Sequence, residues 1–266
     1  MLETFIRKNE VTFDRFCSSY WPHFNSNLRK NLDPSRVFTE IMTHIKGGVQ
    51  EGESCDSKRS RQTYISLSDR RFSTLSAEKR DLIYSIFEAY EKMKMERGEF
   101  DLADFVLDVH SRLENGDIPG DKMDFVYIDE VQDLTMRQIC LFRYICKNVD
   151  EGFVFSGDTA QTIARGIDFR FEDIRSLFYN EFYIKARNFQ LCETRQKGVI
   201  SDIFSLSQNF RTHTGVLRLA QSVIDLISYF FPQSIDVLDP EISHIYGEPP
   251  IFLEPGGDEN SIFSIF

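Results

Sequence analysis

The sequence predicts an α/β protein in which a parallel sheet follows a mainly helical region. Two short runs rich in aromatic and β-branched residues, 125–128 and 153–155, have the length and composition of buried strands. The residues between them are apolar at close to helical spacing, namely at Met136, Ile139, Cys140, Phe142 and Ile145. A strand, a helix and a strand in this order form a parallel pair whose carboxyl ends meet at one edge of the sheet.

The first hundred residues carry helical patterns. Residues 33–35 are typical of a helix start, and Gly47–Gly48 stop the apolar stripe that follows. Ser76 can cap a second helix, which we expect over residues 79–95. The predicted organisation is a mainly helical subdomain over 1–98, a sheet-containing domain half over 99–231 and the start of a further domain over 232–266.

The first predicted strand ends in two carboxylates, Asp129 and Glu130. Phosphate-bearing ligands usually bind at the carboxyl edge of an open α/β sheet. There an Asp can hold the divalent metal that bridges phosphate oxygens, and a neighbouring Glu can orient or deprotonate the attacking water. The pattern therefore predicts a Walker B element with Asp129 as the metal ligand. The alternative is that both residues simply end a strand, because acidic residues are common in turns.

Two later segments have a related design. Gly157 and Asp158 follow the second predicted strand, with Gln161 three residues further on. Asn209-Phe210-Arg211 precedes an amphipathic helical pattern over 215–230, and an Arg in this place can reach a terminal phosphate. The alternative for Arg211 is an ordinary surface residue near a helix start.

These segments resemble, in the right order, motifs II, III and IV of superfamily 1 helicases of the UvrD/Rep type. The motif residues are Asp129–Asp133, Gly157–Gln161 and Asn209–Arg211, and Arg97–Asp104 resembles the segment that precedes motif II. The amino-acid sequence of these segments is more similar still to the UvrD-like helicase region of plant proteins and of large proteins with tetratricopeptide and ankyrin repeats. The similarity is strongest over residues 100–231.

The resemblance implies a partial P-loop NTPase fold of the RecA-like type, with a helical insertion and with ATP and Mg²⁺ as cofactors. Asp129 would bind Mg²⁺, Glu130 would activate water, Gln161 would sense the γ-phosphate, and Arg211 would contact it from the second motor domain. Gln132 and Asp133 would couple this site to motif III. The implied partners are single-stranded nucleic acid, with DNA favoured over RNA, and the remaining helicase domains of a longer chain.

The residues after Gln161 depart from the family pattern, in which an aromatic ring often follows and stacks on a base. Phe169, with Arg165 and Arg170, is the best substitute for that ring. The alternative is that Phe169 is a core residue, since large aromatic side chains usually pack inside.

The sequence contains no G-x-x-x-x-G-K-[ST] loop to hold the β- and γ-phosphates. Two explanations fit: a fragment of a longer motor, or a degenerate module that no longer hydrolyses nucleotide. Both predict little or no activity for this chain alone. The alternatives to a helicase motor are therefore a non-catalytic interaction or regulatory module and an ATP-driven switch without unwinding.

Composition limits the partners and the compartment that we expect for this protein. A formal net charge of -11 argues against whole-molecule attraction to nucleic acid, so any contact must come from a local basic strip. The five cysteines are scattered without a C-x-x-C pair, which suits a reducing compartment and indicates no zinc site. No apolar segment is long enough to cross a bilayer. We expect a soluble nuclear or cytoplasmic protein without membrane partners.

Overall fold

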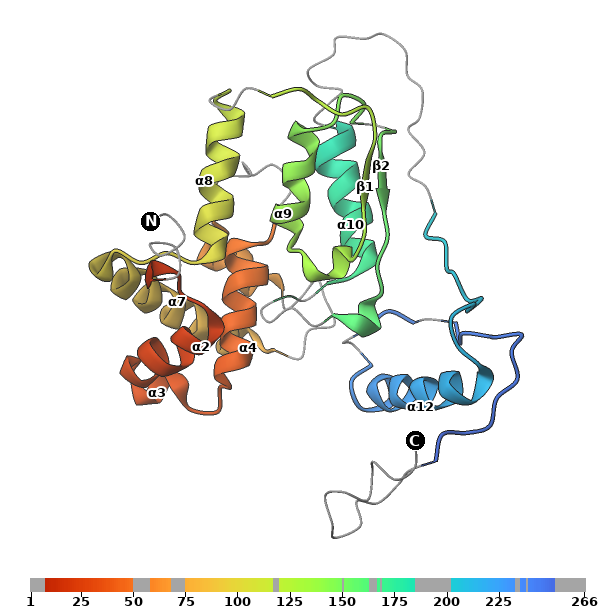
Figure 1. Cartoon of the computed structure of the whole chain (residues 1–266). Coiled ribbons are helices and arrows are strands. Elements are labelled where there is room, and N and C mark those ends of the chain that lie inside the picture. Colours follow the sequence, from red (N-terminus) through yellow and green to blue (C-terminus); the bar gives the residue numbers. More distant parts are fainter. Residues whose placement is uncertain are drawn as a thin grey trace. The chain divides into compact units, whose positions relative to one another are not determined.

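The chain consists of two compact units, Met1–Ser201 and Asp202–Phe266, which are described separately. The computed structural model, shown in Figure 1, describes residues 8–49, 58–67, 75–116, 120–149, 151–162, 167, 169–184, 202–232, 235–237 and 239–251. The predicted boundaries at 98/99 and 231/232 stay predictions.

The amino-terminal part of the first unit is helical, as expected. Its elements are α2 Phe13–Arg15, η1 Phe16–Tyr20, η2 Trp21–His23, α3 Ser26–Arg29, α4 Pro34–Thr39, η3 Glu40–Lys46, α5 Arg61–Ile65, α7 Ala77–Arg97 and α8 Leu102–Glu114. Asp33 caps α4 and Ser76 caps α7 by accepting a backbone N–H, which confirms both predicted helix starts. Gly47 ends η3, and Gly98, with a φ of 64°, ends α7.

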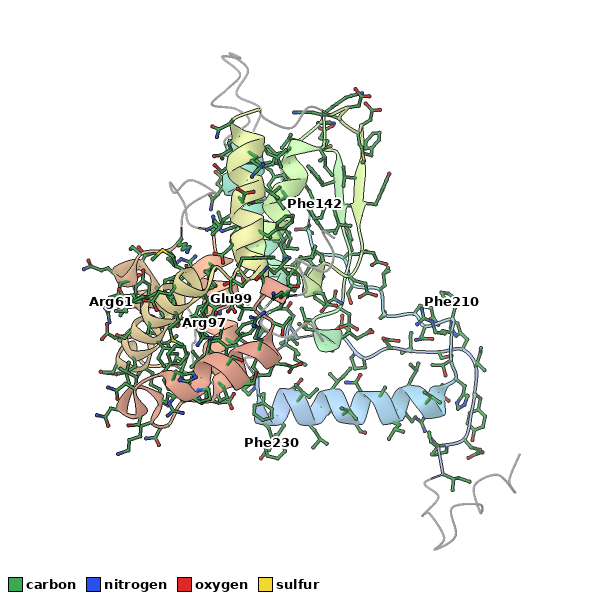
Figure 2. All side chains as sticks on the ribbon, turned by 60° about the vertical axis from the view of Figure 1, so that its left-hand side comes forward. Arg61, Arg97, Glu99, Phe142, Phe210 and Phe230 are labelled. Carbon is green, nitrogen blue, oxygen red and sulfur yellow. The ribbon has the colours of Figure 1, made fainter. Side chains whose placement is uncertain are left out.

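An aromatic core holds these helices together. The ring of Phe16 packs within 5.2 Å of Phe38 and 5.5 Å of Tyr90, and Tyr20 lies 5.1 Å from Tyr90. Arg97 and Glu99 lie at the carboxyl end of α7 (Figure 2). Arg97 lies over the ring of Tyr20, and Glu99 accepts a hydrogen bond from the Tyr20 hydroxyl. The core therefore joins the first helices to α7, which is far from them in the sequence.

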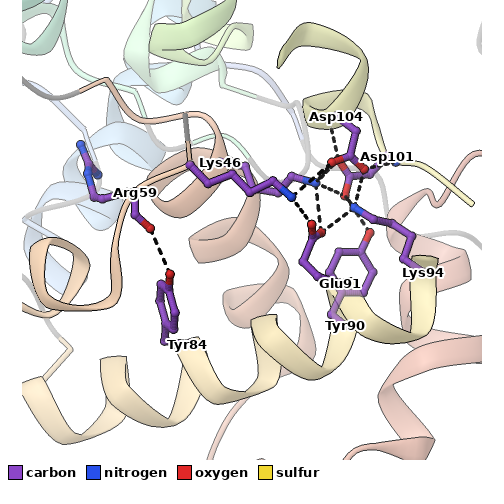
Figure 3. A network of polar contacts seen from close by, with 9 residues as sticks. Lys46, Arg59, Tyr84, Tyr90, Glu91, Lys94, Asp101 and Asp104 are labelled. Carbon is purple, nitrogen blue, oxygen red and sulfur yellow. Dashed lines mark hydrogen bonds and ion pairs between the residues drawn. The ribbon is translucent and has the colours of Figure 1, made fainter. Parts of the chain in front are cut away.

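A buried ionic cluster fixes the end of η3 to α7 and α8 (Figure 3). Lys46 donates to Asp101 at 2.6 and 2.7 Å and to Asp104 at 2.6 Å, and Lys94 donates to Asp101 at 2.7 Å. Glu91 accepts from both of these ammonium groups. Burial alone would raise the pKa of Asp101, but the ammonium groups of Lys46 and Lys94 outweigh it and hold that pKa below its usual range. Asp101 therefore stays ionised and also caps α8.

The second part of the first unit contains the predicted parallel pair. Strand β1, Val126–Ile128, pairs with β2, Phe153–Phe155, with Val126 opposite Phe153 and Ile128 opposite Phe155. Between the strands lie η4 Val131–Asp133, α9 Met136–Leu141 and η5 Phe142–Tyr144. After β2 come η6 Thr159–Gln161, α10 Phe171–Leu177 and η7 Phe178–Ile184. The strand, helix and strand order is confirmed.

One face of this pair is covered and the other is not. Val126 and Ile128 pack with residues of α9 and α10, which lie beside the strands in Figure 1. Tyr127 and Val154 point to the other face and are exposed. The sheet has two strands within the described residues. An α/β fold with a parallel sheet and many helices is therefore confirmed.

The second unit is built around α12, Thr214–Phe230, which confirms the predicted helix. A bridge between Gln208 and Ile242 brings the segments before and after the helix together. Phe210 and Phe230 extend away from the ribbon of this unit in Figure 2, and both side chains are exposed.

Among the described residues, none of the helices combines the length and the apolar character that a membrane crossing requires.

The first prediction concerns the ionic cluster. Replacing Asp101 by Ala leaves two buried ammonium groups without their main acceptor, so the free energy of unfolding should fall by about 3–5 kcal/mol. Asp108→Ala is the matched control, because its pair with Arg112 is exposed and should contribute less than about 1 kcal/mol. Urea unfolding of the full chain measures both. An equal loss in the two variants would contradict the assigned role of the cluster.

Candidate functional site

The carboxyl ends of β1 and β2 bring the predicted motif residues together. The register places residue 129 beside residue 156. There the Ser156 hydroxyl donates to Asp129 Oδ1 at 2.7 Å, and the Glu130 N–H donates to the same oxygen at 3.0 Å. These two hydrogen bonds lower the pKa of the Asp129 carboxyl, which is exposed. Asp129 therefore presents an ionised carboxylate at the edge of the sheet.

Glu130 is held by backbone and side-chain contacts. Its backbone is left-handed, with a φ of 52°, which is uncommon for a residue other than glycine. Its Oε2 atom accepts the amide of Gln132 at 2.6 Å. The Gln132 side chain is buried, and its Oε1 atom accepts the backbone N–H of Asp158 at 3.0 Å. Gln132 therefore bridges the end of β1 and the turn after β2.

The lack of a side chain at Gly157 makes room for the Gln132 amide that bridges the two turns. A Cβ atom at Gly157 would overlap the Gln132 Oε1 atom and lie 3.2 Å from Val131 Cγ1. The close approach explains the glycine that the sequence carries between the second strand and Asp158.

Gln161 is attached to the same turn. Its amide donates to Asp158 Oδ2 at 2.7 Å, and the other oxygen of Asp158 accepts the Ala160 N–H at 2.9 Å. A continuous set of hydrogen bonds therefore joins Glu130, Gln132, Asp158 and Gln161. The expectation that Asp129, Glu130 and Gln161 lie at one edge of the sheet agrees with this geometry.

The donor set fits Mg²⁺, which prefers oxygen ligands. Asp129 and Glu130 are exposed residues with carboxylate oxygens, and the Ser156 hydroxyl lies beside Asp129. Glu91, Asp101 and Asp104 form a second group of carboxylates with metal-like spacing, but the ammonium groups of Lys46 and Lys94 already lie among them. The edge of the sheet is therefore the better candidate for a metal.

Other predicted site residues have different outcomes. Phe169 is 2% exposed and its ring meets that of Phe171 at 5.3 Å, so it lies in the core, as the alternative expectation had it, and is not available to stack on a base. Arg170 is half-buried just before α10. Arg165 lies outside the described residues.

Arg211 belongs to the second unit. Asn209 Oδ1 accepts the backbone N–H of Arg211 at 2.8 Å and that of Thr212 at 3.0 Å, so Asn209 shapes the turn before α12. The Arg211 side chain is exposed. Its role toward a phosphate stays a prediction.

Sequence reasoning missed one residue at the site and one buried residue of α9. Ser156 was not singled out, although its place directly after the second strand could have indicated a partner for Asp129. Arg137 was hidden inside the helical pattern of α9, yet it is 1% exposed and its carbonyl lies 2.8 Å from His110 Nε2. Burial lowers the pKa of His110 to about 4, so this imidazole is neutral at physiological pH.

Comparison with known proteins identifies the family. The family model described as the UvrD/REP helicase N-terminal domain matches residues 9–179. The chain belongs to this family. It is 33% identical over 247 residues to human TPR and ankyrin repeat-containing protein 1, a match that covers 92% of this chain and 8% of that protein. It is 27% identical over 179 residues to an ATP-dependent helicase/nuclease subunit of Syntrophomonas wolfei, covering 66% of this chain and 12% of that protein.

The matches confirm the resemblance read from the motifs, including its link to a protein with tetratricopeptide and ankyrin repeats. The chain spans only a small part of the length of these relatives.

The second prediction concerns Gly157. Replacing it by Ala forces the Gln132 side chain or the turn to move, so the free energy of unfolding should fall by about 1–3 kcal/mol. Gly120→Ala is the matched control, because a Cβ there meets nothing within 4 Å. Thermal unfolding of both variants of the full chain measures the difference. Equal midpoints would show that the Gln132 bridge does not constrain the turn.

The third prediction concerns pH. Because burial holds the His110 pKa at about 4, below its ordinary 6.5, the unfolded chain binds more protons between these values. This contribution to stability is present above about pH 6.5 and is lost as the pH falls toward about 4, up to roughly 3 kcal/mol. In His110→Gln the loss between about pH 7 and about pH 5 should be smaller, as urea unfolding will measure. An identical acid loss in both proteins would exclude His110 as its source.

Proposed function

We propose that this chain is part of the motor core of a UvrD-like helicase, which couples ATP hydrolysis to movement on single-stranded nucleic acid. Membership of the family supports the class of protein. The observation that carries the proposal is the hydrogen-bonded edge of the sheet, where Asp129 and Glu130 lie next to the turn that holds Gln161.

Each residue then has a distinct task. Asp129, ionised at neutral pH, would hold Mg²⁺. That ion would supply positive charge to stabilise the transferred phosphoryl group. Glu130 orients and deprotonates the attacking water, and Gln132 keeps its carboxylate in one position. Gln161 senses the γ-phosphate, and Arg211 contacts it from the second motor domain.

The motor requires parts that these residues do not supply. We propose that the phosphate-binding loop and the other helicase domains come from a longer polypeptide, consistent with the small share of each relative that the chain matches. In this arrangement residues 1–98 form the helical insertion, 99–231 a RecA-like half with motifs II to IV, and 232–266 the start of the second motor domain. Arg165 and Arg170 would approach the nucleic acid, with DNA favoured over RNA.

A second candidate is a helicase-like interaction module without catalysis. The absence of a G-x-x-x-x-G-K-[ST] loop from the 266 residues and the net charge of -11 favour it. The two proposals differ in nucleotide turnover, and an ATP-driven switch would differ from a helicase in lacking stimulation by nucleic acid.

The fourth prediction tests the proposed function. In the longest polypeptide that carries this chain, Glu130→Gln should lower kcat for ATP about 10²- to 10⁴-fold, because it removes the base and keeps the shape. Glu151→Gln, an exposed residue before β2, is the control and should leave kcat unchanged. Turnover is measured with Mg²⁺, with and without single-stranded DNA.

Three results would contradict the motor proposal in different ways. Turnover that Glu130→Gln does not change would place the base elsewhere. Nucleotide binding without turnover would indicate a regulatory module that keeps the pocket. Turnover that single-stranded nucleic acid does not stimulate would favour a switch.

A further inference from the structure

The carboxyl end of η3 and the residues that follow it are hydrogen-bonded to α9. We call residues 45–49, which include the last two residues of η3, the strap. Two of its carbonyls accept from Arg137: the Arg137 N–H donates to Gly47 O at 3.0 Å, and Arg137 Nη2 donates to Gly48 O at 2.5 Å. The Arg137 side chain is 1% exposed, so both bonds are shielded from water. One residue of α9 therefore holds the strap at two consecutive positions.

Arg59 holds the strap from the helical side. Its N–H donates to Ile45 O at 2.9 Å, and its guanidinium donates to His44 O at 2.7 Å and to Val49 O at 3.2 Å. The strap thus lies between two buried arginines, one from each part of the unit.

The two glycines of the strap are required by this packing. A Cβ atom at Gly47 would overlap Met42 O and lie 2.9 Å from the Thr135 Cβ atom. A Cβ atom at Gly48 would lie 2.6 Å from Arg59 Nη1 and 2.7 Å from His44 O. The pair that sequence analysis treated only as a helix stop is therefore also the place where the backbone approaches α9.

The strap is anchored in both cores. The Lys46 side chain ends in the ionic cluster with Asp101 and Asp104 (Figure 3). Val49 packs against the apolar cluster that contains β1 and α9. A displacement of the helices that hold Lys46 therefore acts on the strap, and through it on Arg137.

Arg137 is also close in the chain to the motif II residues. Thr135 and Gln138 form a capping box at the start of α9, directly after the 129–133 segment. That segment is short and its backbone is hydrogen-bonded: Asp133 N–H donates to Glu130 O at 3.1 Å, Leu134 N–H donates to Val131 O at 3.1 Å, and Val131 N–H donates to Ser156 O at 3.0 Å. A displacement of Arg137 is therefore transmitted over a few hydrogen-bonded residues to Gln132, which orients the Glu130 carboxylate.

We propose that Arg137 is a positioning residue of the nucleotide site, through which the strap fixes the 129–133 segment relative to the helical subdomain. The inference rests on the proposed function for the role of Glu130. Arg137 does not contact substrate. It acts by holding α9 against residues 47 and 48, so that a movement of the helical subdomain changes the placement of Glu130.

Hydrogen exchange of the full chain tests the mechanical part. In Arg137→Met the amides of Val131, Asp133 and Leu134 should exchange roughly tenfold faster or more, whereas those of α7 should not change. Arg143→Met is the matched control, because Arg143 is an arginine of the same part of the unit that joins η5 to Glu114 of α8 at 2.8 Å. Uniform loss of protection across the unit, or unchanged exchange at 131–134, would overturn the proposal.

A second variant tests whether the strap is the route. In Gly48→Ala the added Cβ would lie 2.6 Å from Arg59 Nη1, so the Gly47 and Gly48 carbonyls should move relative to Arg137. Exchange at the amides of 131, 133 and 134 should then become faster. Because both changes break one connection, the double variant should resemble the more severe single variant. Additive effects would show that Arg137 acts independently of the strap.

Turnover separates this inference from the proposed function. In the polypeptide used for hydrolysis, Arg137→Met should lower kcat about tenfold or more with KM little changed, since small misplacements of a catalytic group are costly. If the parent protein shows no turnover, the proposed function fails while the exchange result still decides the positioning role. If turnover is normal in Arg137→Met, the positioning role fails and the proposed function stands.

Discussion

The parallel pairing of β1 with β2 determines the geometry of the site. With Ile128 opposite Phe155, residue 129 must lie beside residue 156, so the Ser156 hydroxyl reaches Asp129. The same register brings the turn after β2 to the buried amide of Gln132, which then holds Glu130. A shift of one residue would turn every strand side chain to the other face and separate these groups.

Charge inside the helical part has a comparable organising effect. The ammonium groups of Lys46, Lys94 and the more exposed Lys58 balance the carboxylates of Asp101, Asp104 and Glu91, and Lys46, Lys94 and Asp101 are buried. Breaking such a buried group is costly, although forming it adds little net stability over an apolar core. Its value lies in geometry, because it fixes the carboxyl end of η3 to α7 and α8.

Much of the architecture followed from the sequence because local rules decide it. The caps at Asp33 and Ser76, the helix between the strands and the parallel pair all obey patterns of spacing and turn chemistry. Residue contacts between distant segments did not follow. Neither the approach of Gly47 and Gly48 to Thr135 and Arg59 nor the burial of Arg137 leaves a periodic signal, since both depend on how two cores meet. The burial of Phe169 could not be predicted either, because the sequence around an aromatic residue near a motif does not show whether its ring faces a base or the core.

The proposed chemistry requires Asp129 to hold the metal of a nucleotide at the edge of the sheet. Electron paramagnetic resonance can follow Mn²⁺ bound, with a non-hydrolysable ATP analogue, to the longest polypeptide that carries this chain. We expect Asp129→Asn to weaken nucleotide-dependent Mn²⁺ binding by about tenfold or more, whereas Asp108→Asn should leave it unchanged. Equal Mn²⁺ affinity in the Asp129 variant and the unaltered protein would show that the metal is held elsewhere.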